Sequence, residues 1–173
     1  IGSHNASASI ETLPGSPRDL IVAPREVTVG VGESLALSAT VRDSVGNVIY
    51  GGQINWFSTI GTIGSNGMFV AGTTAGTGVV TAACMGLTAE VAITVLPGAL
   101  FNISISPSEL RLEPQTTAVI TVVGYDSFGN ELPETMFSWT TGIGSLLPTG
   151  VQSQMVLQAG YSVGTGVVTV TSG

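Results

Sequence analysis

Apolar and polar residues alternate along much of the chain, and no stretch spaces its apolar residues three and four apart over several turns, as a helix would. The segment 34–41 reads S-L-A-L-S-A-T-V and places Leu35, Leu37 and Ala39 on one face, because successive side chains of a strand point to opposite sides. Such alternation is typical of a strand with one buried face. The pattern therefore predicts an all-β protein.

Other short stretches with strand character lie between residues that favour turns. They are expected at 20–22, 26–29, 53–58, 68–70, 77–84 and 88–95. Pro24 separates the first two, and because proline cannot donate a hydrogen bond to a sheet, it predicts a divided edge strand. Together with 34–41 this gives about seven strands in about 80 residues, a density typical of immunoglobulin-like sandwiches.

A five-residue motif that occurs twice indicates an internal duplication. D-S-V-G-N occupies 43–47, and D-S-F-G-N occupies 126–130, 83 positions later. Each copy follows an alternating apolar stretch, and a tryptophan comes at the same distance behind it, Trp56 and Trp139. Self-similarity at a fixed period is the signature of repeated structural units.

The duplication extends toward the end of each copy. G-T-G-V-V-T at 76–81 recurs at 164–169, now 88 positions later, so five residues are inserted within 145–161. Units of this length are near the lower end of ordinary domain size. We therefore expect an N-terminal tail at 1–16, a first domain at 17–97 and a second domain at 98–173.

The second copy lacks the last strand of the first. After V-V-T-A-A-C the first copy continues into the alternating segment 88–95, whereas the second copy stops soon after V-V-T-V. Without that strand, an apolar face and unpaired backbone groups are exposed. Two explanations remain open: the sequence ends before the strand, or another chain donates a strand to the edge near Val167–Val170.

Further short motifs of the first copy carry a family resemblance. They follow the D-S-V-G-N turn as W-F-S at 56–58, G-T-I at 61–63, G-M-F-V-A at 67–71 and G-T-G-V-V-T-A at 76–82. In this order they resemble bacterial immunoglobulin-like domains of the invasin, intimin and group-2 type. The second copy keeps the turn, S-W-T at 138–140 and G-T-G-V-V-T, but departs from the pattern at 146–158. The resemblance implies two tandem immunoglobulin-like β-sandwiches of a microbial surface protein and specifies no ligand.

Charge is sparse and mostly negative: four arginines, no lysine and eleven acidic residues give a formal net charge of −7. Because no basic stripe can neutralise phosphates, we expect no nucleic-acid partner. No uninterrupted apolar run approaches the roughly 18 residues that cross a bilayer, so we expect no membrane insertion by this segment. The opening I-G-S-H resembles a tag-cleavage scar, and we expect the chain to be a piece of a longer protein.

The composition offers little for catalysis. The only histidine, His4, lies in the scar-like opening, so no Ser-His-Asp or Cys-His arrangement can be assembled. A pair of carboxylates can hydrolyse glycosides, but the glutamates fall in expected turns or at strand edges. The single Cys84 cannot form an internal disulfide and is expected to be a small buried hydrophobe. We therefore expect neither enzyme activity nor a cofactor.

The repeated turn has two interpretations. Its carboxylate and amide oxygens are candidate calcium ligands, which gives Asp43 and Asn47 in one copy and Asp126 and Asn130 in the other. Calcium takes about six to eight oxygen ligands, however, and neither copy has the spacing of an EF-hand loop. Asp, Gly and Asn are also the residues that turn chemistry requires. A structural turn is the favoured interpretation, and we expect no metal.

The two tryptophans are expected in the cores. A central-strand tryptophan of a sandwich usually packs against the opposite sheet. Trp56 and Trp139 both lie on the alternating apolar face. The competing interpretation, a platform that stacks on a sugar, requires an exposed ring.

Five polar residues are candidates for modification or binding. Asn5 and Asn102 each begin an N-x-S triplet and are candidate glycosylation sites. Gln152, Gln154 and Gln158 lie in the stretch with the insertion. Loops added to a scaffold often carry function, so this stretch is the first place to expect a binding loop, against the alternative of ordinary loop variation.

Taken together, these features favour a non-catalytic structural or adhesive stalk segment of a larger protein that is secreted or held at a microbial cell surface. Its expected partners are the other domains of that protein and a glycan or protein receptor. Two alternatives remain open: an ancillary carbohydrate-binding module of a secreted enzyme, and a pilus or surface-layer subunit completed by strand donation. The location expected in every case is extracellular.

Overall fold

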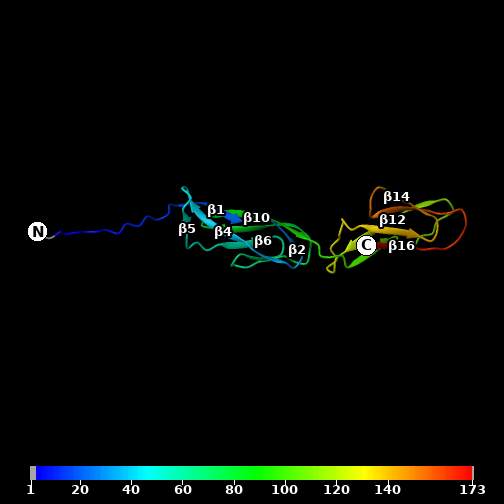
Figure 1. Cartoon of the computed structure of the whole chain (residues 1–173), viewed down its shortest axis with the longest axis horizontal. Helices are drawn as coiled ribbons and strands as arrows, with labels where there is room; N and C mark the ends of the chain where they lie inside the picture. Colours follow the sequence, from blue (N-terminus) through cyan, green and yellow to red (C-terminus); the bar gives the residue numbers. More distant parts are fainter. Residues whose placement is uncertain (1–2, 173) are drawn as a thin grey trace. The chain divides into compact units, whose positions relative to one another are not determined.

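The computed structural model describes residues 3–172, which form strands, turns and loops without a helix (Figure 1). The chain divides into two compact units. The first contains the residues up to Gly72 together with Gly76–Val95, and the second contains Thr73–Ala75 together with the residues from Leu96 onward. Within residues 3–172, no helix has the length and apolar character needed to span a bilayer. The prediction of an all-β chain is confirmed.

The first unit contains β1 to β10 in three small sheets, of order β1-β4-β5, β2-β10-β9-β6 and β3-β8-β7. The strands are β1 (Pro17–Ala23), β2 (Glu26–Gly30), β3 (Ser34–Ala36), β4 (Ser38–Asp43), β5 (Val48–Ile49), β6 (Asn55–Ser58), β7 (Thr62–Ile63), β8 (Met68–Val70), β9 (Gly76–Cys84) and β10 (Leu87–Leu96). The chain passes from β1 to β2 at Pro24, as the sequence predicts.

The predicted strand 34–41 is divided at Leu37, because β3 before it pairs with β8, whereas β4 after it pairs with β1. The N–H of Leu37 donates to the carbonyl of Gly67, at 2.8 Å. The predicted inward face is nevertheless confirmed, since Leu37 is buried and Leu35 and Ala39 pack against the core. Strands β5 and β7 were not predicted, because two residues are too few to display an alternating pattern.

The core of the first unit is formed mainly by side chains of β8, β9 and β10. Phe69, Val80 and Val91 are fully buried, and Ile93 and Val95 are nearly so. Val80 and Val91 face each other across the antiparallel pair β9–β10. Directly opposed side chains on one face are the unit of sheet stabilisation, so β10 contributes both hydrogen bonds and core.

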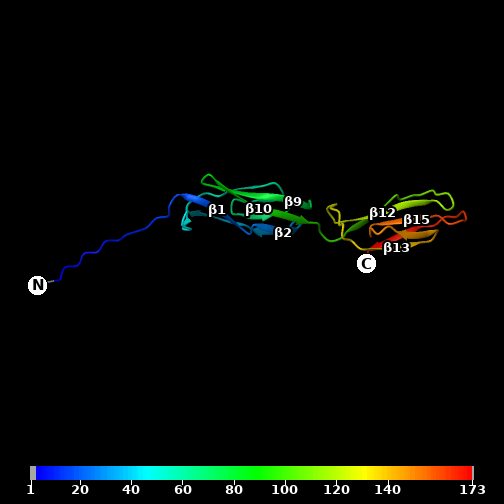
Figure 2. The ribbon, with the colours of Figure 1, turned by 90° about the horizontal axis from the view of Figure 1, so that it is seen from above.

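The second unit repeats the arrangement with fewer strands. They are β11 (Asn102–Ser106), β12 (Thr117–Tyr125), β13 (Phe137–Thr141), β14 (Ser145–Pro148), β15 (Gln154–Gln158) and β16 (Val168–Ser172), in sheets of order β11-β12-β15-β14 and β13-β16. Figure 2 shows β13 in a layer apart from β12 and β15. Strand β12 spans the counterparts of β3 and β4 and pairs with both β11 and β15.

Among the described residues, the second unit has no counterpart of β10. The prediction of a sandwich without its last strand is therefore confirmed. Two neighbouring segments are affected. Glu109–Glu113, the counterpart of β2, is not a strand, and neither is Gly164–Val167, the counterpart of the first half of β9.

Truncating the ring of Phe69 in β8 tests the importance of the first unit's core. Phe69→Ala removes a fully buried side chain, and we expect a loss of about 3–5 kcal/mol in the free energy of unfolding of this unit, the usual cost for a buried phenylalanine. Urea denaturation measures it. The matched control is Met68→Ala, whose side chain is exposed on the same strand and should cost within about 0.5 kcal/mol. Equal costs for the two variants would contradict this description of the core.

Candidate functional site

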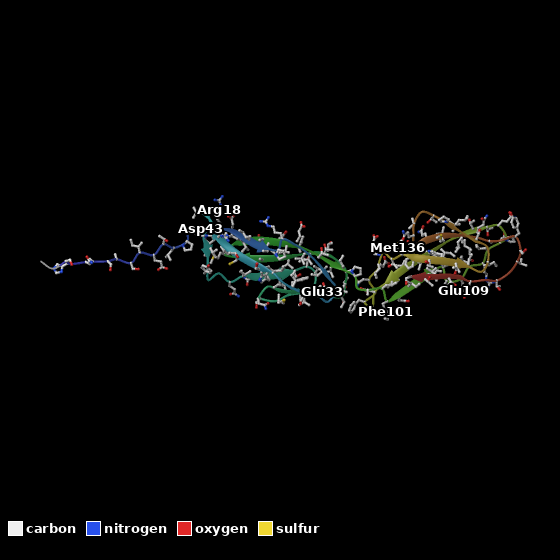
Figure 3. All side chains as sticks on the ribbon, viewed as in Figure 1. Arg18, Glu33, Asp43, Phe101, Glu109 and Met136 are labelled. Carbon is white, nitrogen blue, oxygen red and sulfur yellow. The ribbon has the colours of Figure 1, made fainter. Side chains whose placement is uncertain are left out.

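Asp43, at the end of β4, is a buried carboxylate with four hydrogen-bond donors. Its Oδ1 accepts from the N–H of Val45 at 3.0 Å and from the N–H of Asn47 at 2.9 Å. Its Oδ2 accepts from the side-chain amide of Asn47 at 2.9 Å and from the N–H of Gly15 at 2.8 Å. Figure 3 shows Asp43 at the end of the first unit where the N-terminal tail joins it. The carboxylate thus organises its own turn and also binds the segment that leads into β1.

Asp126 repeats this arrangement after β12. Its Oδ1 accepts from the N–H of Phe128 at 2.8 Å and from the N–H of Asn130 at 2.9 Å. Its Oδ2 accepts from the side-chain amide of Asn130 and from the N–H of Gly98, both at 2.8 Å. Gly98 stands just before β11, as Gly15 stands just before β1. We call Gly15 and Gly98 the leading glycines of the two units.

The sequence of the turn explains its backbone. The N–H of Asp43 donates to the carbonyl of Asn47 at 3.0 Å, and the N–H of Gly46 donates back to the carbonyl of Asp43 at 3.2 Å. Gly46 has a φ of 93° and its counterpart Gly129 a φ of 86°, a region in which a side chain is strained. Asp opens the turn because its short side chain reaches N–H groups two and four residues ahead.

The hydrogen bonds hold the pKa of both carboxyls far below the ordinary value of 3.8. For Asp43 the largest cause is the N–H of Gly15, followed by the Asn47 side chain. Burial raises the pKa, but these bonds and those from the N–H groups of Asn47 and Val45 outweigh it, so the pKa falls to about 2. For Asp126 the largest effect is burial, which raises the pKa. The Asn130 side chain and the N–H of Gly98 outweigh it, so the pKa again falls to about 2. Both carboxylates are therefore charged at neutral pH.

Each of the two carboxylates already accepts four hydrogen bonds, which weighs against the calcium interpretation. Asp43 and Asp126 are the only buried charged side chains of the described core, at 3% exposure each. Among the described residues no buried side-chain nitrogen or oxygen lacks a partner, and no three His, Cys, Asp or Glu side chains gather at one place. Turn chemistry and the bonds to the two leading glycines therefore account for the contacts of Asp43 and Asp126. The absence of a metal at these turns remains a prediction.

Sequence reasoning missed the role of the leading glycines. The available signal was the triplet L-P-G, which occurs at 13–15 and again at 96–98, at the same spacing of 83 as the turns. The triplet itself has no side-chain pattern that indicates a hydrogen bond, and the role of its glycine follows from the contacts of Asp43 and Asp126.

Trp56 and Cys84 lie where the pattern predicts, whereas Trp139 is half-buried. Trp56 is half-buried and packs against the first core. Trp139 is also half-buried, and its ring N–H donates to the carbonyl of Gln152 at 3.4 Å. Cys84 is a free, buried thiol beside the core residue Ala82 on one face of β9, so its expected role as a small hydrophobe is confirmed.

The polar candidates do not form one cluster. Gln154 and Gln158 occupy the two ends of β15, about 13 Å apart along an extended strand, while Gln152 precedes the strand and is exposed. Asn102 is exposed at the start of β11, and Asn5 is exposed in the tail. Both sequons are therefore accessible, and glycosylation and a binding loop both remain predictions.

Acid should weaken the first unit through Asp43. Because the folded pKa of about 2 lies below the ordinary value of 3.8, the carboxylate contributes its stability fully above about pH 4, and this is lost as the pH falls from about 4 to about 2. Urea midpoints measured from pH 5 to pH 2 should fall less steeply for Asp43→Asn than for the parent chain. Asp19→Asn, at an exposed position of β1, is the matched control and should keep the parent slope. An unchanged slope in Asp43→Asn would contradict the role of the turn.

Calcium should leave both units unaffected. Since each carboxylate oxygen already accepts two hydrogen bonds, binding an ion would require their exchange for coordination. We expect the melting temperature to be the same in millimolar calcium and in EDTA, as measured by calorimetry. A rise in calcium that disappears in Asp43→Asn or Asp126→Asn would restore the calcium interpretation.

Comparison with known proteins shows which solved structures share this fold. No protein-family model matches the chain, and no curated protein matches its sequence. Among solved structures, the chain is similar to FdeC, an adhesin of Escherichia coli, with a TM-score of 0.60 and 19% identity over 93% of this chain and 61% of that one. It is also similar to invasin, a bacterial integrin-binding protein, with a TM-score of 0.53 and 16% identity over 87% of this chain and 35% of that one. Domains 4 and 5 of the S-layer protein SbsC match at a TM-score of 0.43 and 18% identity over 92% of this chain and 94% of that one.

The chain thus spans less than two thirds of the length of the FdeC and invasin structures. At these identities the likeness concerns the fold and leaves ligands open. The chain has the fold of the tandem immunoglobulin-like modules of bacterial adhesins, as the resemblance in its motifs implies.

Proposed function

We propose that the chain is a non-catalytic structural segment, a stalk, of a larger protein exposed at a microbial cell surface or secreted from the cell. The observation that carries this proposal is the repeated binding of a leading glycine by a buried aspartate. Asp43 binds Gly15 in the first unit, and Asp126 binds Gly98 in the second. Each unit therefore fixes the segment through which the chain enters it.

A stalk requires that the segment entering each unit is held firmly, and it does not require a binding site. Tension along a chain of modules acts first on the segments that join them, so an anchored leading residue keeps each module's first strand in its sheet. The hydrogen bonds in question involve a charged acceptor, and such bonds are stronger than those between neutral groups. The fold shared with adhesin structures supports the same interpretation.

The carbohydrate-binding alternative depends on exposed aromatic rings. Tyr50, Phe57 and Tyr161 are exposed, whereas Tyr125 and both tryptophans are half-buried. Phe57 is the exposed aromatic of the sheet that contains β6. A sugar platform usually combines an exposed ring with polar neighbours, and on this strand Asn55 is the other exposed residue. Phe57 is therefore the position at which the carbohydrate-binding alternative can be tested.

A glycan array probed with the purified chain separates the two functions. We expect no binding above background, because a stalk presents other domains and does not need a sugar site of its own. Saturable binding to a polysaccharide that is lost in Phe57→Ala or Tyr50→Ala would contradict the stalk and favour the carbohydrate-binding module. Val45→Ala, at an exposed apolar position without an aromatic ring, is the matched control and should behave like the parent chain.

A further inference from the structure

Strand β6 (Asn55–Ser58) forms an open edge of the first unit. The sheet order β2-β10-β9-β6 places β9 on one side of this strand, and no described strand pairs with its other side. Phe57, in the middle of β6, is a large apolar side chain with 61% exposure. An exposed apolar residue on an open strand edge favours the addition of a further strand.

The pairing with β9 shows which backbone groups of β6 face outward. The register of the pair continues to Thr59, whose N–H donates to the carbonyl of Val79 at 3.0 Å. Along an antiparallel strand, the residues that exchange hydrogen bonds with the neighbouring strand alternate. Phe57 therefore also bonds to β9, whereas the N–H and C=O groups of Trp56 and Ser58 point away from it.

The other edges of the first unit carry features that hinder strand addition. A register shift between Pro17 and Asp19 interrupts β1. Pro24 and Arg25 precede β2, which begins with the charged Glu26. Strands β3, β5 and β7 have only two or three residues. Irregular, charged or very short edges are the usual protection of a sheet against a second chain, and β6 has four residues without a charge, a proline or a register shift.

The surroundings of β6 are uncharged. Residues 44–89, which include β5 to β9, contain no charged residue, although the chain has a formal net charge of −7. Glu90 of β10 faces Thr81 of β9, which faces Phe57, so this carboxylate lies two strands from the edge, about 9–10 Å away. Two copies can therefore meet at this edge without bringing like charges together, a juxtaposition that would oppose association.

The strand is also complementary to itself. When two copies of β6 lie antiparallel with Phe57 of one copy opposite Phe57 of the other, Trp56 of each copy faces Ser58 of the other. The N–H and C=O groups that point away from β9 then form reciprocal hydrogen bonds. The two phenyl rings lie directly opposite each other on one face, and aromatic pairs in this position stabilise a sheet.

We propose that β6 of one copy of this chain pairs antiparallel with β6 of a second copy, so that the two four-stranded sheets continue into each other. A second copy fits this edge because it brings the same uncharged strand, the same outward backbone groups and the same exposed ring. For a stalk, this edge supplies a lateral contact between neighbouring copies, which goes beyond the proposed function.

The second unit offers a matched comparison. Its counterpart of β6 is β13, in which Thr140 stands at the position of Phe57, at the period of 83. Thr140 is exposed as Phe57 is, but it is small and polar. The edge of β13 therefore lacks the aromatic anchor, and we expect association through the first unit alone.

Sedimentation velocity of the full chain over a concentration series tests the association. The parent chain should form dimers that increase with concentration into the millimolar range, without longer species, because a two-fold pairing closes on itself. Phe57→Asp should abolish the dimer, since it places two carboxylates directly opposite each other. Thr140→Asp is the matched control and should dimerise like the parent. A parent chain that stays monomeric at every concentration, or a Phe57→Asp variant that dimerises as well as the parent, would overturn the proposal.

An exchange of charges tests the register. Phe57→Lys alone should also be monomeric, whereas its equimolar mixture with Phe57→Asp should form a mixed dimer that weakens as salt is added. This recovery requires that position 57 of one copy faces position 57 of the other, and it shows that both variants are folded. A mixture that dimerises no more than either variant alone would contradict the register.

Cysteine cross-linking tests the same register with Phe57 in place. In the proposed pairing Asn55 of one copy faces Thr59 of the other, and residues so placed have Cα atoms about 4.5 Å apart, within the range of a disulfide. Mild oxidation should join Asn55→Cys to Thr59→Cys. It should not join two copies of Asn55→Cys, whose substituted residues lie about 13 Å apart along the strands. Equal cross-linking in both samples would exclude the pairing, and the parent chain, whose Cys84 is buried, is the control.

This proposal and the stalk function fail separately. A monomeric chain leaves the stalk function in place, because that function rests on the anchored leading glycines. Binding on a glycan array leaves the dimer in place, because the two measurements report different properties of the chain.

Discussion

The pairing of β9 with β10 is the interaction on which much of the first sandwich depends. In the first unit β10 fills the core with Val91, Ile93 and Val95, and its backbone orders β9 on one side and β2 on the other. Without this strand, its layer of core side chains, the first half of β9 and the whole of β2 would lose the partner that orders them. The second unit shows the result in Glu109–Glu113 and Gly164–Val167, which are irregular. Strand formation there is a consequence of tertiary pairing, because isolated strands have little stability of their own.

This dependence also sets the limit of what sequence can predict. Alternation placed β8, β9 and β10 to within about a residue or two, since these strands are long or bear strong apolar faces. The letters G-T-G-V occur twice, however, as a strand at 76–79 and as an irregular segment at 164–167. Identical local sequence cannot predict different local structure. The difference lies in a partner strand about 10 to 20 residues away, which is present in the first unit and absent from the described residues of the second.

The candidate site was predicted only in part, again because some of its contacts come from distant residues. Turn chemistry identified Asp43 and Asp126 correctly as turn residues, but their burial and their hydrogen bonds to Gly15 and Gly98 were not predicted. A carboxylate in a turn is ordinarily solvated. Here burial is tolerated because four donors replace water around each carboxylate, and a buried charge is stable only when it is compensated in this way. The distant donor, a backbone N–H, has no side-chain signature, so the glycine is visible only as a repeated triplet.

The closing strand and the leading glycine belong to one continuous segment. Strand β10 ends at Leu96, Pro97 follows, and the N–H of Gly98 is bound by Asp126. A single residue therefore separates the strand that closes one unit from the residue that the next turn holds, and proline leaves that residue little torsional freedom. In the tail, Leu13, Pro14 and Gly15 repeat this order. The repeating element is therefore a closing strand followed by an anchored glycine, which joins the completion of one sandwich to the start of the next.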